Sequence, residues 1–196
     1  MASAANILEG SFDVDKKIEE YLNVYLKVTN KNVGVLSLTE SCCNELMWAH
    51  YGGSYAGYVV GFDSNSSFFK PKKGDPKVCG ELMSVIYSDA RPVVDIEPGK
   101  MEIPKEVFFT KSRKWEYEKE WRMLKYLGMA DEGIPKENPS IHLFSVPPDA
   151  ITEVIFGSKF DGTARGEIES KTKDYAPHVT FKEQFYDAKQ DRILIR

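Results

Sequence analysis

The sequence contains no apolar run that approaches the roughly 20 residues of a membrane-spanning helix. Basic residues are not in excess either, since 26 Lys and Arg stand against 30 Asp and Glu, a formal net charge of −4. These absences exclude a chain with an apolar membrane helix and a generally basic nucleic-acid-binding protein. The start, MASAANILEGSFDVD, has neither a basic nor an apolar stretch, so we expect no signal peptide and no membrane partner.

Cysteine and histidine are also scarce, with three of each. Cys42 and Cys43 are adjacent and Cys79 is the third, so the odd total leaves no disulfide framework and no CxxC pair. The three histidines lie far apart, and we therefore expect no zinc site and no metal cofactor. The pattern predicts reduced, partly buried thiols in a cytoplasmic protein. A nucleophilic Cys42 or Cys43 is a less favoured alternative, because no motif supports it.

What is present indicates one domain of 196 residues, with 42% hydrophobic, 12% aromatic and 29% charged residues. Strands outnumber helices and do not alternate with them, which predicts an α+β fold: a mixed, mostly antiparallel sheet flanked by a few helices. We expect residues 1–32 to form an N-terminal helical segment of this domain. We expect helices at 14–28, broken by Asn30-Lys31-Asn32, and at 44–51, 104–118 and 163–175; strands at 33–38, 57–63 (a central strand), 81–87, 120–126, 140–145, 151–157, 178–181 and 192–196; an exposed loop at 64–77; and irregular or loop structure at 90–100 and 131–139.

The first chemically unusual patch is the predicted helix 44–51 with the glycines after it. Met47, His50 and Tyr51 share one face of this helix, and Tyr58 follows the glycines. Hydrogen-bonding groups and flat rings beside a backbone that a ligand can approach closely suit an aromatic or nucleotide ligand. The alternative is a core helix in which a backbone carbonyl satisfies His50.

The second patch, residues 111–122, alternates carboxylates with aromatic and basic residues. On a strand, Glu116, Glu118 and Glu120 would project from one face, with Arg122 beside Glu120. Clustered carboxylates raise one another's pKa and an arginine holds one ionised, as in acid–base or cation-stabilising sites. The alternative is a solvated charged face with salt bridges of little energetic value. The nearby basic residues predict a locally basic cleft for a phosphate-bearing ligand: Lys111, Arg113, Lys114, Lys119 and Arg122.

Four ordered strings carry a resemblance to a known family: LMWAHYGGSYAGYVVGFD, VIYSDARPVV, KSRKWEYEKEWRML and ITEVIFGSKFD. They resemble the bacterial domain-of-unknown-function 2971 family (DUF2971), with its MW-x-HY helix, G-[YF]-x-x-G-[YF] strand, V-x-Y-x-x-x-R-P segment and W-x-YE-x-EWR element. The resemblance runs from about Val33 to the C-terminus. The family is uncharacterised, so its name implies no activity.

A weaker resemblance links the same order of motifs to the ADP-ribosyltransferase superfamily. It implies NAD as substrate, a transfer to a protein or nucleic-acid acceptor, and a cleft lined by helix 44–51 and strand 120–126. It also implies Glu120 as the catalytic carboxylate, with Glu118 at the first position of an E-x-E pair. The cofactor-binding residues that it implies are His50 as a hydrogen-bonding group, Tyr51 or Tyr58 as a stacking ring, and Ser37 and Arg122.

One departure from that superfamily bears on NAD binding. The usual first strand, with a histidine, arginine or tyrosine that holds the NAD ribose, and the N-D-P segment of DUF2971 members have no counterpart before Gly34. We therefore expect a truncated or divergent member of the family. The main alternative to a transferase is a non-catalytic module that binds a nucleotide or a protein, and a metal-dependent hydrolase is less favoured because the three glutamates come from one short segment. The sequence predicts no oligomeric state.

Overall fold

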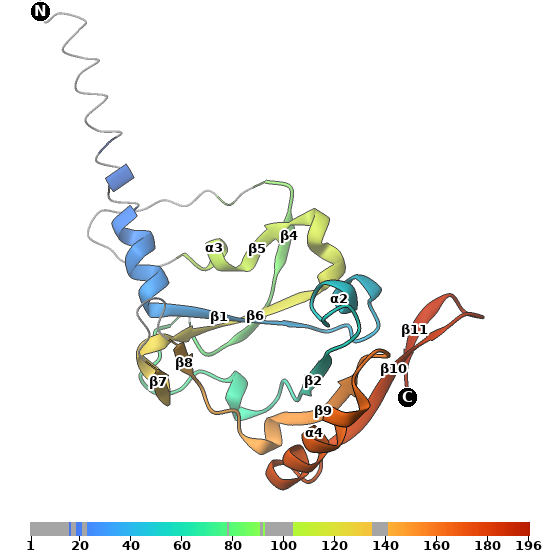
Figure 1. Cartoon of the computed structure of the whole chain (residues 1–196). Coiled ribbons are helices and arrows are strands. Elements are labelled where there is room, and N and C mark those ends of the chain that lie inside the picture. The colour runs from blue at the N-terminus through green and yellow to red at the C-terminus, as the bar shows by residue number, and fades with distance from the viewer. Residues whose placement is uncertain are drawn as a thin grey trace, which may run out of the picture.

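A computed structural model describes residues 16, 19–20, 23–77, 79–90, 92, 104–134 and 141–196, and shows an α+β fold, as predicted (Figure 1). Residues 23–32 are helical and lead directly into the first strand. The strands are β1 (Val33–Thr39), β2 (Tyr58–Phe62), β3 (Leu82–Ser84), β4 (Ile86–Ser88), β5 (Thr110–Ser112), β6 (Glu120–Tyr126), β7 (Glu132–Ile134), β8 (Ile141–Leu143), β9 (Ile151–Phe156), β10 (Thr180–Asp187) and β11 (Arg192–Ile195). The helices are α2 (Glu45–His50), α3 (Lys105–Phe109) and α4 (Gly162–Tyr175), with 3-10 turns η1 (Ser67–Phe69), η2 (Arg113–Glu118), η3 (Leu127–Met129) and η4 (Pro148–Ala150).

The strands form two larger sheets and two small ones. The first has the order β1-β6-β3 and is antiparallel throughout. The second has the order β11-β10-β9-β2, in which β9 and β10 are parallel and the other pairs antiparallel. The small sheets pair β4 with β5 in parallel and β7 with β8 antiparallel. Antiparallel pairs predominate among the described strands, which agrees with the predicted mixed sheet.

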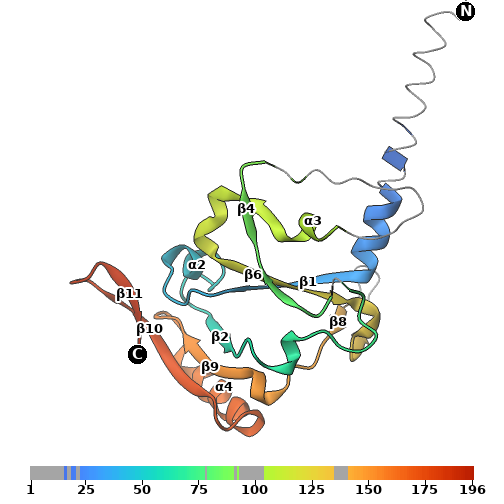
Figure 2. The same cartoon turned by 180° about the vertical axis from the view of Figure 1, so that it is seen from behind.

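Apolar side chains from both larger sheets are buried on both faces. Met123 and Leu124 of β6 point to opposite faces and are completely buried, because Met123 packs with Phe68 and Phe69 and Leu124 with Cys79 and Phe109. In β9, Val154 and Phe156 pack under α4, whereas Ile155 points the other way, toward α2. Seen from behind (Figure 2), α4 lies on the side of its sheet that is turned away from β1 and β6. The opposite face of β9 is therefore available to a site.

Two predictions are wrong although the strand and the helix that they concern exist: the place of one strand in its sheet, and the point where one helix ends. The strand at 57–63 was predicted to be central, but β2 lies at the end of its sheet. Its apolar character has another cause, because Tyr58–Phe62 line a cavity. The predicted break at Asn30-Lys31-Asn32 is also wrong: the helix continues to residue 32, where the Asn32 side chain donates a hydrogen bond to the carbonyl of Val28 at 2.7 Å.

Two segments that periodicity predicts to be single elements are each divided into several elements in the structure. The predicted helix 104–118 is α3, β5 and η2, because the backbone of residues 110–112 pairs with β4. The predicted strand 81–87 is divided into β3 and β4 at Val85, whose amide donates to the carbonyl of Glu120 at 2.9 Å. The segment 64–77 is not wholly exposed, since η1 buries two phenylalanines, and β7 lies inside the predicted loop 131–139. The predictions for 1–15, 17–18, 21–22, 91, 93–100 and 135–140 fall outside the described residues.

Candidate functional site

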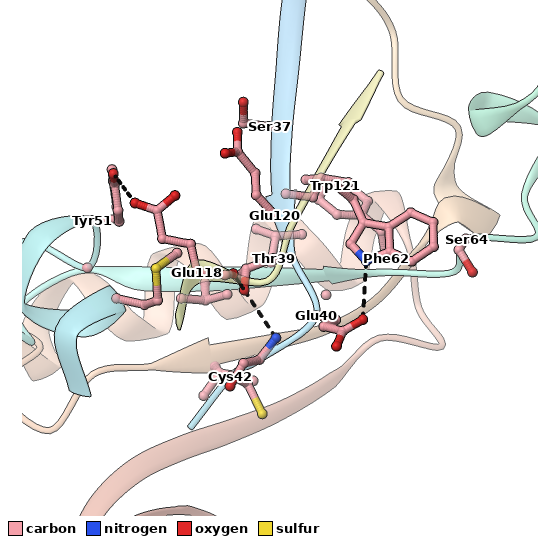
Figure 3. A pocket seen from close by; sticks show the side chains of 18 of the residues that line it. Ser37, Thr39, Glu40, Cys42, Tyr51, Phe62, Ser64, Glu118, Glu120 and Trp121 are labelled. Carbon is pink, nitrogen blue, oxygen red and sulfur yellow. Dashed lines mark hydrogen bonds between the residues drawn. The ribbon is translucent and has the colours of Figure 1, made fainter. Parts of the chain in front are cut away.

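A cavity of about 960 Å³ lies between the three-stranded sheet and the strands β2 and β9 (Figure 3). Its walls come from segments far apart in the sequence, and most of its lining is apolar. Ionised or hydroxyl side chains line it from β1, the β1–α2 connection, the end of α2, β2 and the residues after it, β5, η2, β6 and β9. The polar lining residues are Ser37, Thr39, Glu40, Ser41, Tyr51, Tyr58, Ser64, Lys111, Glu118, Glu120, Arg122 and Glu153.

Four of these side chains form one hydrogen-bonded group, which we call the charged cluster: Lys111, Glu118, Glu120 and Arg122. Lys111 Nζ donates to Glu118 Oε2, and to Glu120 Oε2 at 2.9 Å. Arg122 binds Glu120 in a bidentate way, with Nε 2.8 Å from Oε1 and Nη2 3.0 Å from Oε2. Both carboxylates are nearly inaccessible, with 3% of the Glu118 side chain and 7% of the Glu120 side chain exposed.

A left-handed residue brings the two glutamates together. Lys119 has φ 45° and ends η2, so the chain turns between Glu118 and Glu120 instead of continuing as a strand. Both carboxylates can then reach the same ammonium group. The three glutamates do not share one face of a strand, because Glu116 and Glu118 belong to η2. Glu116 is 59% exposed and lies outside the cavity lining.

Burial and hydrogen bonds act in opposite directions on the pKa of Glu120. Burial alone raises it, but hydrogen bonds from Arg122, Lys111 and Ser37 outweigh burial and lower this pKa from 4.5 to about 2. Burial likewise lowers the pKa of Lys111, whereas Glu118 and Glu120 raise it, and the net change is upward. Glu120 therefore remains an anion at neutral pH: it can accept hydrogen bonds or stabilise a cation, but it has no proton to donate.

Tyr51 reaches the charged cluster from α2. Its hydroxyl donates to Glu118 Oε1 at 3.0 Å, and this bond raises the pKa of Tyr51 (Figure 3). The helix is held in place by Asn44, whose side-chain oxygen caps the amides of Leu46 and Met47 and whose Nδ2 donates to the carbonyl of Tyr117 at 3.0 Å. The Tyr51 residue is 64% exposed, so its ring lies at the mouth of the cavity.

A comparison with protein-family models matches residues 47–123 to Protein of unknown function (DUF2971). The predicted family is thus confirmed over this range, while its wider extent stays a prediction. No curated protein and no solved structure matches the chain, so the resemblance to ADP-ribosyltransferases has no support from these comparisons.

The DUF2971 segment contains the whole charged cluster and two of the predicted cofactor-binding tyrosines, Tyr51 and Tyr58. Ser37 lies before it, on β1, where its Cα is paired with that of Arg122. Figure 3 shows Ser37 beside Glu120. Tyr58 lines the cavity from β2, with its ring 6.1 Å from that of Phe160. The fold therefore brings six of the seven predicted site residues into one cavity.

His50 is the predicted site residue that does not join the others. It is exposed, its ring lies 6.3 Å from the ring of Tyr51, and it is not among the residues that line the cavity. Met47 and Tyr51 line the cavity, whereas His50, at the last position of α2, does not, so the face that these three residues were predicted to share does not reach the cavity as a whole. The predicted role of His50 as a hydrogen-bonding group in this cavity has no geometric basis.

The predicted basic cleft is also wrong. The cavity lining holds two cations, Lys111 and Arg122, and four carboxylates, at positions 40, 118, 120 and 153. Of the other basic residues, Arg113 pairs with Asp89 at 3.1 Å and Lys119 lies 3.8 Å from Glu40, both at the surface. The alternation of charges in the sequence does not show which of these basic side chains enter the cavity and which lie at the surface.

Lys111 is the site residue that sequence reasoning underrated, since it was counted only among the basic residues nearby. Its place depends on β5, which pairs in parallel with β4 through a register of Ile86 with Thr110 and Tyr87 with Lys111. No local pattern indicates such a pairing. Thr39 is a second omission: its hydroxyl donates to the carbonyl of Glu118 at 2.6 Å and ties β1 to η2. Among the described residues, no three or more His, Cys, Asp or Glu side chains are grouped as a metal site.

Proposed function

We propose that this DUF2971 protein is an ADP-ribosyltransferase-like enzyme that uses NAD as its substrate. The observation that carries the proposal is the pair of buried carboxylates, Glu118 and Glu120, which share Lys111 inside a cavity of about 960 Å³. A cavity of this size can hold a nucleotide. The order of motifs that resembles the superfamily supports the same assignment.

The charge of the cavity favours the nicotinamide end of NAD. Nicotinamide carries a positive charge in NAD, and a lining with more carboxylates than cations attracts it. The exposed rings of Tyr51 and Tyr58 offer flat surfaces for this ring. The apolar wall restricts water around the bond that breaks and comes from the side chains of Leu38, Met47, Val60 and Ile155.

The proposed step needs a permanent anion and no acid. The bond between the nicotinamide nitrogen and C1′ of the ribose breaks, and its electron pair leaves with nicotinamide. The acceptor's nucleophile bonds to C1′ and releases its proton to water. Glu120, which is ionised throughout, accepts a hydrogen bond from the ribose and stabilises the positive charge that develops at C1′. Glu118, held by Tyr51 and Lys111, is placed for the acceptor or a second ribose hydroxyl.

The test follows nicotinamide release from NAD by the purified protein, with and without added protein or nucleic acid as acceptor. We expect Glu120→Gln to lower the rate by about a hundredfold or more, because the amide has the shape of the carboxylate without its charge. Glu116→Gln is the matched control, since Glu116 lies in the same segment but outside the cavity, and its rate should equal that of the wild type. Equal rates in wild type and Glu120→Gln would contradict the proposal.

One observation favours the alternative of a binding module without activity. Both oxygens of Glu120 already have partners, Arg122 on one and Arg122 with Lys111 on the other, as in a structural ion-pair network. If this alternative is correct, NAD raises the melting temperature but no nicotinamide is released. If NAD leaves the melting temperature unchanged and no nicotinamide is released, NAD is not the ligand.

The proposal includes a reducing, cytoplasmic location, with a protein or a nucleic acid as acceptor. The described part of the chain has no helix that is long and apolar enough to cross a membrane. Cys42, Cys43 and Cys79 are free thiols. A location in an oxidising compartment, found by fractionation of cells, would contradict this part.

A further inference from the structure

Two adjacent thiols lie at the edge of the cavity and take no part in the chemistry proposed above. Cys42 and Cys43 are both exposed, and their Sγ atoms are 3.5 Å apart. Cys42 also lines the cavity, whereas Cys79 is buried, with 1% exposed. As residues, the adjacent pair is thus more exposed than Cys79.

The backbone around the pair is anchored on both sides. The amide of Ser41 donates to Thr39 Oγ1 at 3.1 Å, which holds the end of β1. The carbonyl of Cys42 accepts a hydrogen bond from the buried Trp48 indole at 2.8 Å, and Asn44 then caps α2. These bonds limit the positions that the backbone can take, so the short distance between the sulfurs is a property of the folded chain.

We propose that Cys42 and Cys43 are a redox-active dithiol, which a disulfide oxidant of the glutathione class converts to an intramolecular disulfide. One thiolate attacks the external disulfide, forms a mixed disulfide and releases the first thiol. The neighbouring thiolate attacks the protein sulfur of the mixed disulfide, closes the Cys42–Cys43 bond and releases the second thiol. The protein loses two protons and two electrons, together two hydrogen atoms, and the oxidant gains them and becomes two thiols.

Closure of this bond changes the wall of the cavity. The sulfurs must approach from 3.5 Å to about 2.05 Å. Neighbouring Cα atoms are only about 3.8 Å apart across a trans peptide, below the usual range for a disulfide, so the Cys42–Cys43 backbone must adjust. That backbone holds the indole of Trp48 and lies directly before α2, which carries Tyr51. The dithiol thus couples oxidation to the position of α2, whatever ligand the cavity takes.

The reaction should be slow at neutral pH. Although the residue as a whole is exposed, partial burial of the Cys42 thiol and its contact with Cys43 raise its pKa to about 11. The thiolate is the attacking form, so closure accelerates as the pH rises toward this value.

The experiment incubates the folded protein with oxidised glutathione, then unfolds it under acid quench and counts thiols. We expect the count to fall from three to one, with a loss of two hydrogen atoms by mass spectrometry, a Cys42–Cys43 link in the peptide map and full reversal by dithiothreitol. Cys79→Ser should close in the same way, which leaves no free thiol. The fluorescence of Trp48, compared with that of Trp48→Phe, reports whether α2 responds.

Single-cysteine variants keep the test decisive. Cys43→Ser and Cys42→Ser have no neighbour to resolve the mixed disulfide, so each should retain one bound glutathione. Wild-type protein that retains glutathione as these variants do, or that forms only disulfides between chains, would overturn the proposal. None of these measurements uses NAD, so their outcome is separate from that of the transferase test.

Discussion

The Glu120 carboxylate remains ionised in a place that would by itself favour the neutral acid. It lies at the first position of β6, with 7% of its side chain exposed, and its amide donates to the hydroxyl of Tyr87 at 2.8 Å. The guanidinium of Arg122, two residues along the same strand, meets it because alternate residues of a strand share a face. This pairing of residues 120 and 122 was visible in the sequence, whereas the approach of Lys111 from β5 was not.

The lowered pKa of Glu120 predicts a loss of stability in acid. Between pH 4.5 and about 2 the unfolded chain binds a proton at this position and the folded chain does not, so the free energy of unfolding falls as the pH falls. At about 1.4 kcal/mol per pKa unit, the shift corresponds to about 3 kcal/mol. Urea unfolding at pH 7, 5, 4 and 3 measures this dependence.

The matched variants separate Glu120 from the other acids of the segment. Glu120→Gln should be less stable at pH 7, because Lys111 and Arg122 lose their partner, and should show a shallower fall toward pH 3. Glu116→Gln should keep the slope of the wild type, since its side chain is mostly exposed. The same slope in all three proteins would show that Glu120 does not control acid stability.

Among the secondary-structure elements, η2 and β6 depend on a residue in an unfavourable conformation. Lys119 has φ 45°, which side chains with a Cβ adopt at a cost of about 1 kcal/mol. We expect Lys119→Gly to be neutral or to stabilise the protein slightly, because the ion pair of Lys119 with Glu40 is at the surface. Lys114→Gly, inside η2, should instead destabilise it by about 0.5–1 kcal/mol. Thermal unfolding of both variants checks the opposite signs; a clear loss in Lys119→Gly would contradict this explanation.

The short helix α2 depends on Asn44 more than on its own length. Six residues are too few for a helix that is stable in isolation, and Asn44 both caps it and ties it to Tyr117. Asn44→Ala should cost about 1–2 kcal/mol of unfolding free energy, measured in urea, and should weaken any ligand that contacts Tyr51. Asn65→Ala is the control, because Asn65 bonds only to nearby Asp63. Equal losses in the two variants would show that the cap is not important.

At the scale of the whole molecule, a close backbone contact joins segments about a hundred residues apart. The amide of Gly157, after β9, donates to the carbonyl of Gly57 at 2.9 Å, and the amide of Lys159 donates to the carbonyl of Tyr55 at 3.0 Å. This contact holds the turn after α2 against the four-stranded sheet. It therefore sets one side of the cavity.

Gly157→Ala tests that contact. A Cβ at position 157 would lie 2.1 Å from the carbonyl oxygen of Tyr55, so the turn must move, and we expect a loss of about 1–3 kcal/mol. Gly162→Ala is the control: a Cβ there meets nothing within 4 Å, and alanine favours the start of α4. Differential scanning fluorimetry compares the two, and a Gly157→Ala protein as stable as Gly162→Ala would contradict the contact.

Much of the fold followed from local patterns in the sequence. The runs VGVLSL, EWRML and ITEVIF are apolar or alternate with period two, and they are β1, β6 and β9 in the structure. The helical pattern of residues 44–51 predicted α2, although its polar start was expected at residues 39–41 and the structure places the cap at Asn44. The region of Thr163 to Tyr175 predicted α4. These predictions succeeded because side-chain periodicity and helix caps act over a few residues.

The sequence by itself determined the α+β class, the family over residues 47–123, and the presence of Glu118, Glu120 and Arg122 in one short segment. Only the tertiary structure decided that Lys111, Ser37 and Tyr51 meet those glutamates while His50 and Glu116 do not. The physical reason is that strand pairing between distant segments and the left-handed turn at Lys119 set these distances. The local periodicity of the sequence predicts neither the pairing of these strands nor the turn at Lys119.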